Sequence, residues 1–400
     1  MKRNRRSKRS NNRRPLFYLV IIFLIVIAWI NLSSKETLIL HNDRYVRTYE
    51  TEITLIKNEQ VFYFDDNPSY FVSSGTRVSL NRPLSDQKVT NQKYISDKVE
   101  ILNAALSKNE ATGKILDTAL IDLFDEEKKM ESQRNIRIML SSLKYCHKTD
   151  DEISTMLEDI SASTITGLTL KKIGSSYPGY VYFEDDGYEQ ILAFDNMDLM
   201  SEEFLKQADE FAKLNAGYGS NILKVADDDA VVLVAEVSND VQLQREASLD
   251  DKKNDIYDRL EKRDLASYVE LLTNRVDILR SLPKVRFTLE DKEFEAHLIE
   301  SVKGKDNKLL IFIMKDMIDS NILKLRKAKT NIYTYENQGY VIPAKSVFKK
   351  NGKTYIMVLS KGYLRKNIEV SVTEVTDGKA FLSKSDNSEL SEGLQVLVNP

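Results

Sequence analysis

The feature that most constrains this chain is an uncharged apolar segment close to its start. Residues 15–32 read PLFYLVIIFLIVIAWINL, and no residue from Leu16 to Ile30 is charged. An α-helix rises about 1.5 Å per residue, so the segment is long enough to cross the hydrocarbon core of a bilayer. Tyr18 and Trp29 lie near its two ends, where amphipathic rings prefer to sit. The pattern predicts a transmembrane helix over residues 15–32.

The residues before this segment indicate its orientation. Residues 1–14 contain eight Lys or Arg and no acidic residue. Basic residues beside a membrane-spanning helix stay in the cytoplasm, so we expect this head to be cytoplasmic and everything after Leu32 to lie outside the cell membrane. A basic head in this position is also suited to bind anionic lipid.

A cleaved signal peptide is the alternative for the same segment. Its apolar region is shorter and ends in a cleavage site of the A-x-A type. Here the apolar run is long, and Asn31-Leu32-Ser33-Ser34 is a poor cleavage site. The pattern therefore favours an uncleaved anchor and a single-pass membrane protein.

The charge of the chain argues against nucleic acid as a partner. The formal net charge is −3, and because residues 1–14 contribute +8, residues 15–400 carry −11. Once the head is assigned to the membrane surface, no basic face is left for a phosphate backbone. We expect no nucleic-acid partner.

Residue types that commonly carry chemistry are sparse. Cys146 is the only cysteine, so no disulfide can form within the chain, and His41, His147 and His297 are the only histidines. Cys146-His147 resembles half of a metal site, but no second Cys or His lies at ligand spacing, which favours packing at a helix end. The G-x-S-x-G, H-E-x-x-H, G-x-x-x-x-G-K-[ST] and G-x-G-x-x-G motifs are absent. We expect no catalytic, cofactor-binding or metal-binding residues, and no enzyme.

Acidic residues are plentiful and gather in three groups. These groups are Asp65-Asp66, Glu184-Asp185-Asp186 and Asp227-Asp228-Asp229. Charged residues are almost never fully buried unless paired, so such groups are usually solvated loops. We interpret them in that way.

The first half of the chain passes from a strand pattern to a helix pattern. Residues 46–82 show short apolar runs and alternations between turn residues, as in a small β-sandwich or barrel. Residues 91–161 contain no proline and one glycine, and apolar residues recur there at helical spacing. This stripe is expected to pack helix against helix and includes Ile95, Val99, Leu102, Leu106, Ile136, Leu140 and Leu143. Asp150 is expected to cap the helix from Asp151 to Ile160.

Strand patterns return in the second half of the chain. A hairpin is predicted from Gly179–Phe183 and Tyr188–Leu192, which flank an Asp-Asp-Gly turn. A short helix is expected from Glu202 to Leu214, and a charged helical segment over residues 248–281. From Val285 to Pro400 the pattern is all β, with many short strands between turns.

Several short segments, taken in their order, carry a resemblance to a known family. They are Gly75-Thr76-Arg77-Val78, Gly179-Tyr180-Val181 with Asp186-Gly187-Tyr188-Glu189, Val341–Phe348 with Asn351–Val358, and Gly393–Pro400. The order of predicted parts is a membrane helix, half a β-module, a helical hairpin, the other half, a barrel and a final β-domain. Nearly the whole chain thus resembles the HlyD-like membrane-fusion, or periplasmic adaptor, proteins of bacterial export machines, in their Gram-positive form.

The resemblance implies a mainly β fold with an α-helical hairpin and a single N-terminal transmembrane helix. The implied parts are a basic cytoplasmic head (1–14), the transmembrane helix (15–32), a lipoyl-like barrel-sandwich hybrid in two halves (33–90 and 163–225), the hairpin (91–162), a β-barrel (226–338) with a helical insertion (248–282), and a membrane-proximal β-domain (339–400). It also implies docking on a transporter of the cytoplasmic (inner) membrane and homo-oligomers formed through the hairpin.

The chain departs from the family pattern in two ways, the insertion and the length of the hairpin, and it also lacks the lysine of a true lipoyl domain. A true lipoyl domain carries a lysine at a hairpin tip, but no Asp-Lys-Ala occurs in the turns here, and Asp97-Lys98 falls in the predicted helical hairpin. We therefore expect no cofactor and a mechanical role. The insertion at 248–282 is absent from many adaptors. The hairpin has about 70 residues, so it would project only about 45 Å, much less than hairpins that reach an outer-membrane channel.

Three functions are open at this point. The first is an adaptor that docks on an export transporter and couples it to the cell envelope. The second is an envelope scaffold in division or wall assembly that reuses the adaptor architecture without a pump, which the short hairpin and the insertion favour mildly. The third is an exported enzyme such as a wall hydrolase, for which no site is visible.

Overall fold

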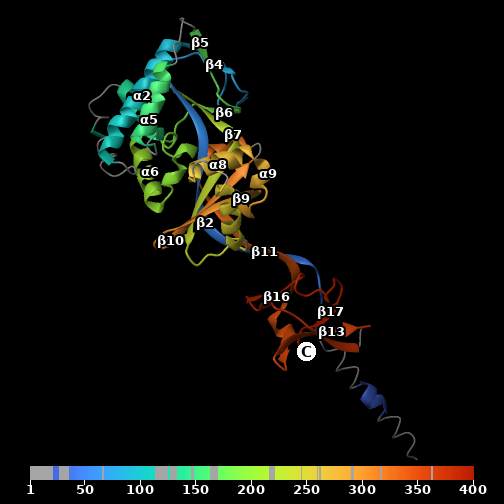
Figure 1. Cartoon of the computed structure of the whole chain (residues 1–400). Coiled ribbons are helices and arrows are strands. Elements are labelled where there is room, and N and C mark those ends of the chain that lie inside the picture. The colour runs from blue at the N-terminus through green and yellow to red at the C-terminus, as the bar shows by residue number, and fades with distance from the viewer. Residues whose placement is uncertain are drawn as a thin grey trace, which may run out of the picture. The chain divides into compact units, whose positions relative to one another are not determined.

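The structure is a computed structural model of the whole chain (Figure 1). It describes residues 21–26, 36–64, 67–112, 125–126, 133–145, 148–162, 170–215, 221–244, 246–258, 260, 263–289, 292–315, 318–361 and 364–400. Residues 21–26 are helical, and the rest of the predicted anchor at 15–32 lies outside the described residues. In the part of the chain just given, no helix is both long and apolar enough to cross a membrane. The anchor stays a prediction.

The chain forms two compact units. The smaller contains Met1–Arg47 and Tyr335–Pro400, and the larger contains Thr48–Thr334. Two long strands, β2 (Asp43–Tyr63) and β11 (Lys327–Pro343), contribute residues to both units. The described chain is mainly β with some helices, as the sequence predicts.

Six strands close into a barrel in the larger unit. Their order is β2-β7-β10-β9-β8-β11, and β11 pairs again with β2, which closes the ring. The strands not yet given are β7 (Ile222–Ser238), β8 (Lys284–Leu289), β9 (Lys292–Lys303) and β10 (Asn307–Lys315). Closure pairs the backbone groups that an open sheet edge would leave exposed. The range predicted for the barrel, residues 226–338, does not include β2, because this strand comes from much earlier in the chain.

The barrel strands carry continuous apolar runs because both of their faces are covered. In β10, every residue from Lys308 to Met314 is buried. Phe287 of β8 and Phe312 of β10 meet edge to face, with ring centroids 4.8 Å apart. Leu272 of the inserted helices belongs to the same core cluster, so these helices pack on the barrel.

The helical insertion lies between β7 and β8. It consists of α7 (Leu249–Tyr257), α8 (Leu265–Asn274) and α9 (Val276–Leu279). Asp264 precedes α8 in an extended conformation, and its carboxylate accepts a hydrogen bond of 2.7 Å from the Ser267 amide. This is the N-cap contact that starts a helix, and it satisfies one of the amides that the first turn leaves unpaired.

Strands from both sides of the helical segment pair into what we call the two-part module. Its own strands are β3 (Arg77–Val78), β4 (Pro83–Thr90), β5 (Leu170–Gly174) and β6 (Gly179–Tyr182). β3 pairs with β6, β4 with β5, and the end of β2 with the start of β7. One small core unites the halves and contains Phe64, Val78, Leu84, Val181, Leu223 and Val225.

The second half of this module has no hairpin. The predicted strand at Tyr188–Leu192 is wrong, because the amides of Ile191 and Leu192 donate to the Tyr188 carbonyl, at 3.0 and 2.9 Å, and form a turn. Ile191 and Leu192 are fully buried in this turn. Apolar side chains can be buried in a turn as well as in a strand, so their presence did not distinguish the two. The short helix η2 (Phe194–Leu199) and then α6 (Glu202–Asn215) follow, the second close to its predicted bounds.

The helical segment contains three described helices and a short turn. They are α2 (Asn91–Thr112), α4 (Gln133–Ser142), η1 (Leu143–Tyr145) and α5 (Asp150–Ala162). α2 packs against both α4 and α5, and Figure 1 shows α2 and α5 side by side.

The apolar stripe of this segment divides between two cores. Leu102 of α2 is fully buried in a small cluster with Tyr145 and Ile153. Leu140 and Leu143 are also buried, but they belong to the large core that includes the barrel. The prediction that the whole stripe packs only between the helices is therefore wrong, because α4 and η1 turn this part of it toward the body of the unit.

The cap of α5 is one residue earlier than predicted. The Thr149 hydroxyl accepts from the Glu152 amide at 3.3 Å, and the Glu152 carboxylate accepts from the Thr149 amide at 3.0 Å. This reciprocal pair is a capping box. Asp150, predicted as the cap, is instead the first helical residue, where its negative charge lies at the positive end of the helix.

The smaller unit begins and ends with paired strands. β1 (Thr37–Ile39) pairs with β17 (Gln395–Leu397), and β17 pairs with β13 (Lys353–Ser360). β12 (Val347–Lys350) and β14 (Leu364–Glu369) also pair with β13.

Two further strands complete this unit around the end of β11. They are β15 (Glu374–Thr376) and β16 (Lys379–Ser383), and Tyr45 stacks on Phe381 of β16 with centroids 4.5 Å apart. Residues 36–47, predicted within the lipoyl-like half at 33–90, therefore lie with the C-terminal residues. The reason is that β1, only three residues long, pairs its backbone with β17.

Candidate functional site

Six charged side chains gather inside the larger unit, where the two-part module meets the barrel. They come from β2, from the loop after β6, from β7 and from the residue before β11, and we call them the ion cluster. Its members are Lys57, Glu59, Asp186, Glu189, Lys224 and Arg326. Buried charges occur in proteins where they are paired, so this group is the most informative constellation in the described chain.

Glu59 lies at the centre of the ion cluster. Arg326 Nη2 donates to Glu59 Oε2 at 2.5 Å, and Lys57 Nζ and Lys224 Nζ lie 3.3 and 3.4 Å from Oε1. Lys57 Nζ also donates to the Leu323 carbonyl at 2.8 Å. The Glu59 side chain has 0% exposure, so three cations face one carboxylate that water does not reach.

Two further carboxylates balance the remaining positive charge. Arg326 donates to Asp186 from Nε and Nη2, at 2.9 and 3.1 Å, and from Nη1 to the Leu55 carbonyl at 3.2 Å. Lys224 donates to Glu189 at 2.8 Å, and Glu189 accepts from the Asp186 amide at 2.8 Å. Three cations thus meet three anions, and the cluster is neutral.

Burial and pairing pull the pKa values of the cluster in opposite directions. Burial alone would raise the pKa of Glu59, but the charges of Arg326, Lys57 and Lys224 outweigh it and hold that pKa well below its usual range. Burial lowers the pKa of Lys57 to about 8, although Glu59 opposes the shift. For Lys224, burial would lower the pKa, but Glu59 and Glu189 hold it above its ordinary value. Every anion–cation contact therefore stabilises the charged forms.

The geometry suits a structural joint better than a reaction centre. A lysine whose pKa is lowered to about 8 could act as a nucleophile in an open site. Here the Lys57 side chain is 1% exposed, and its ammonium already contacts Glu59 and Leu323. No reactant can approach it without opening the core.

Strand register explains why the ion cluster forms at this place. Residues 53–57 of β2 pair with residues 231–235 of β7 in the barrel. After an irregularity, residues 59–63 pair with residues 222–226 in the two-part module. The cluster residues of β2 therefore flank the point where the strand passes from barrel to module. Such bulges re-aim side chains and often mark functional positions.

The acidic groups of the sequence are partly buried, contrary to their interpretation as solvated loops. Asp186 belongs to the ion cluster, and Asp228 is buried beside Arg77, which donates to it from Nε and Nη2. Asp229 pairs with Lys315. The reason is that Asp186 and Asp228 each find a cation from a distant part of the chain, whereas Glu184 and Asp229 are exposed. Asp65-Asp66 lies outside the described residues.

The residues considered for metal binding are not brought together. Cys146 and His147 lie outside the described residues. His41 is in the smaller unit and His297 in the larger, where burial lowers the pKa of His297. Among the described residues, no group of His, Cys, Asp and Glu could hold a metal ion. Asp97-Lys98 lies on α2, as predicted.

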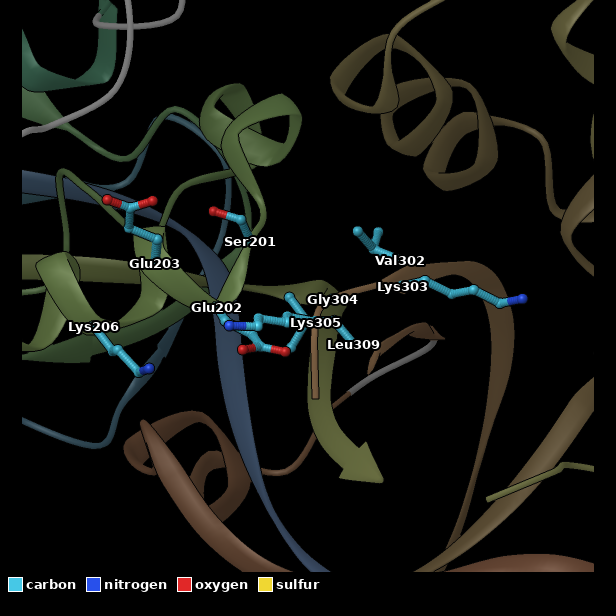
Figure 2. A pocket seen from close by; sticks show the side chains of 9 residues that line it. All are labelled: Ser201, Glu202, Glu203, Lys206, Val302, Lys303, Gly304, Lys305 and Leu309. Carbon is cyan, nitrogen blue, oxygen red and sulfur yellow. The ribbon is translucent and has the colours of Figure 1, made fainter. Parts of the chain in front are cut away.

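A pocket of about 440 Å³ lies between the start of α6 and the turn from β9 to β10 (Figure 2). Glu202 lies against Gly304, where a Cβ would overlap its carboxylate. Glu202 Oε1 is buried and has no hydrogen-bond partner among the residues that the structure describes. Acidic and basic side chains, Glu203 and Lys305 among them, both line the pocket, so its charge selects no class of ligand.

An acidic cavity of about 430 Å³ lies beside α8. Asp198, one of its carboxylates, accepts from the amides of Leu265 and Ala266 at 2.5 and 3.2 Å, and Asp264 caps the same helix. Asp227 accepts from Asn58 at 3.5 Å. These acidic groups start a helix and hold a bulge, so the cavity carries no assigned ligand.

Comparison with known proteins gives only distant similarities. No protein-family model matches the chain, and no curated protein matches its sequence. ZneB from Cupriavidus metallidurans is 10% identical, with 92% of each chain covered and a TM-score of 0.23. MacA from Actinobacillus actinomycetemcomitans is 13% identical, with 91% of this chain and 99% of that chain covered and a TM-score of 0.29. The membrane fusion protein Spr0693 from Streptococcus pneumoniae is 12% identical, with 72% and 100% covered and a TM-score of 0.26. TM-scores this low do not establish a shared fold.

Proposed function

We propose that the chain is a membrane-anchored adaptor, or membrane-fusion, protein. It docks on an export transporter of the cytoplasmic membrane and couples that transporter to the cell envelope. It is not an enzyme, and its work is mechanical. The anchor at residues 15–32 holds the bulk of the chain outside the membrane, and the basic head at 1–14 binds anionic lipid on the cytoplasmic side.

The observation that carries this proposal is the way the larger unit is connected. The two-part module is built from strands on both sides of the helical segment, so the helices are inserted between two paired halves of one β-module. β2 and β7 then continue from the module into the barrel without a break in the chain. The ion cluster ties the two together at the crossing. Force applied to the helices would therefore pass to the barrel through continuous strands and buried charge pairs.

The smaller unit supports the membrane-proximal part of the proposal. β1 begins at Thr37, five residues after the predicted anchor ends at Leu32. Its pairing with β17 connects the start of the extracytoplasmic chain to its end. A short link of this kind keeps the smaller unit close to the bilayer. We propose that copies of the chain assemble through the helical segment.

An affinity pull-down of the intact protein from membranes tests the function. We expect an export transporter to co-purify. The E158K/D159K variant, which reverses two exposed charges on α5, should keep the transporter but lose contacts between copies. A second test addresses topology. Protease added to cells stripped of any outer barrier should degrade the large domain and spare the head, whereas protection of the large domain would reverse the orientation.

A cell-envelope scaffold in division or wall assembly is the second candidate. The observation that favours it is the helical insertion α7–α9, which packs on the barrel and is absent from many adaptors. The described helix α2 has 22 residues, so it spans about 33 Å and is short for reaching a distant channel. Recovery of division or wall proteins without a transporter in the pull-down would select this candidate.

A further inference from the structure

The smaller unit concentrates positive charge in one stretch of its sequence. Between Val341 and Ile368 there are seven Lys or Arg and no Asp or Glu. Residues 15–400 as a whole carry −11. The local excess of cations therefore runs against the charge of the rest of the chain outside the head.

Strand register places part of this charge at one end of a sheet. β1 and β13 are both antiparallel to β17, with Thr37 opposite Leu397 and Val358 opposite Val396. β1 and β13 therefore run in the same direction. The start of β1 therefore points to the same end of the sheet as the start of β13, and the predicted anchor precedes β1 in the sequence.

A tight turn between β12 and β13 forms that end. Asn351 and Gly352 have φ angles of 51° and 77°, as a two-residue hairpin turn requires, and Lys350 lies opposite Lys353. Lys349, Lys350 and Lys353 are all exposed. The end of the sheet nearest the predicted anchor thus presents ammonium groups on a rigid hairpin.

Two lysines at this end have carboxylate partners, and two do not. Lys345 and Lys353 each form an ion pair, at 3.3 and 2.8 Å. Lys349 and Lys350 form no side-chain hydrogen bond or ion pair with any residue that the structure describes. Their charge is not neutralised within the described chain.

Aromatic rings flank the same turn. Phe348 and Tyr355 lie 6.1 Å apart between ring centroids and are both half-buried. Tyrosine, which combines an apolar ring with a polar hydroxyl, is enriched at the boundary between membrane and water. Basic residues beside aromatic rings are a combination suited to a lipid headgroup surface.

Chain length limits how far this turn can lie from the bilayer. Three residues separate Leu32, at the end of the predicted anchor, from Glu36, so four Cα–Cα steps join the two. The Glu36 carbonyl accepts from the Val398 amide at 3.0 Å. At most about 3.6 Å per residue, this link reaches about 14 Å. Attraction between a lysine and an anionic membrane surface acts over a Debye length of about 8 Å.

We propose that the β12–β13 turn docks on the anionic phospholipid surface of the outer leaflet, with Lys349 and Lys350 against headgroup phosphates. The contact would fix the tilt of the smaller unit on the membrane. It rests on the proposed function only for the anchor and its orientation, and it requires no transporter. The lysine ammonium is a compact charge on a flexible side chain, which suits contacts with mobile headgroups. The planar guanidinium of arginine is better suited to a carboxylate or phosphate that is held in one place.

Lysine footprinting of the full chain tests the proposal. The purified protein is reconstituted into vesicles of phosphatidylcholine alone or with one third phosphatidylglycerol, acylated briefly with an amine-reactive reagent and mapped by mass spectrometry. We expect Lys349 and Lys350 to react about fivefold more slowly in the anionic vesicles, since each lysine near such a surface contributes about that factor to binding. The protection should disappear at 0.5 M salt, where screening is about 4 Å.

Matched variants separate position from total charge. Arg365 and Lys366 are exposed on β14, which joins β13 by the turn at its other end. Lys353, opposite Lys350 on the same turn, should be protected together with Lys349 and Lys350 in the anionic vesicles. The R365Q/K366Q variant should leave the protection of Lys353 unchanged, whereas the K349Q/K350Q variant should abolish it. Both variants lose two positive charges at exposed positions, so their total charge is the same and both should fold like the wild type.

The outcomes distinguish this inference from the proposed function. Equal reactivity of Lys349 and Lys350 in both vesicle types would overturn lipid docking. Protection that appears only in native membranes, and not in pure lipid, would assign the turn to a protein partner and also overturn it. Neither result bears on whether a transporter co-purifies in the pull-down.

Discussion

Replacing Glu59 with Gln should destabilise the larger unit strongly. The change keeps the size of the side chain but removes the one carboxylate that faces Lys57, Lys224 and Arg326. Three cations and two anions would remain, and the Glu59 side chain has 0% exposure, so solvent cannot screen the excess charge. Removing one partner of a buried pair costs about 3–5 kcal/mol. In a unit of this size that corresponds to a fall in melting temperature of about 10 °C.

The effect should depend on pH in a defined direction. The pKa of Glu59 is held below its usual range in the folded protein, because the neighbouring cations outweigh burial. Its stabilisation is therefore fully present above the pKa of the unfolded chain, about 4.5, and is lost as the pH falls through the folded pKa. The difference in free energy of unfolding between the wild type and the E59Q variant should shrink below pH 4.5.

Thermal and urea unfolding followed by circular dichroism measure both effects. Glu52, an exposed carboxylate of the same strand, supplies the control variant E52Q, which should change stability by less than about 0.5 kcal/mol. Adding Lys57→Met to E59Q restores a balance of two cations and two anions and should recover part of the loss. An E59Q variant as stable as E52Q at pH 7 would refute the structural role of the ion cluster.

Four further outcomes follow from individual contacts. The free energy of unfolding should rise as the pH is raised from 8 to 10.5. Burial lowers the pKa of Lys57 to about 8 in the folded protein, so in this range the unfolded chain binds more protons than the folded chain. Urea unfolding of the K57M variant should not show this rise. Gly304→Ala should cost about 1–3 kcal/mol, because the added Cβ would overlap both the Glu202 carboxylate and, at 2.7 Å, the Asn307 carbonyl oxygen; E202A in the same chain should therefore recover only part of the loss. Thr149→Ala should cost about 1 kcal/mol and speed amide hydrogen exchange in the first turn of α5. Leu102→Ala and Leu140→Ala should each cost about 2–5 kcal/mol, but only L140A should loosen the barrel in hydrogen exchange.

Local patterns were sufficient to predict most of the helices. The helical spacing over residues 91–161 and 248–281 corresponds to α2, α5 and the inserted helices, because amphipathic periodicity is a property of each segment alone. The capping box at Thr149 was also visible in the sequence as Thr-x-x-Glu. Asp150 alone also fits the N-cap preference, and only the reciprocal contact of Glu152 distinguishes Thr149 from it.

Long-range pairing could not be predicted in this way. Tyr188–Leu192 has strand character, but a strand needs a partner, and none of the described strands pairs with this segment. β1 pairs with β17 more than 350 positions away, and three residues are too few for a sequence signal. The division of the helical stripe between two cores depends on where α4 packs, which no periodicity encodes.

The ion cluster had a local signal that was missed. Lys57 follows Ile53-Thr54-Leu55-Ile56, and Lys224 interrupts a run from Ile222 to Val225, so each lysine stands in a strand whose neighbours are apolar. A charged residue in such a strand must either reach solvent or find a buried partner. The sequence shows the need for partners but not their identity, because Glu59 and Arg326 are 267 positions apart.

The position of the ion cluster gives a reason for six charged side chains at a buried site that apolar side chains could also fill. Replacing a buried ion pair with apolar residues is often neutral or stabilising, so stability alone does not account for it. In β2, however, Lys57 and Glu59 flank the irregularity at which pairing passes from the barrel part of β7 to its module part. A strand of apolar residues could slip in register there, and a slip of one residue would exchange its two faces. Contacts of Glu59 with Arg326 and Lys224 are satisfied in one register only. The cluster therefore specifies where the barrel ends and the two-part module begins.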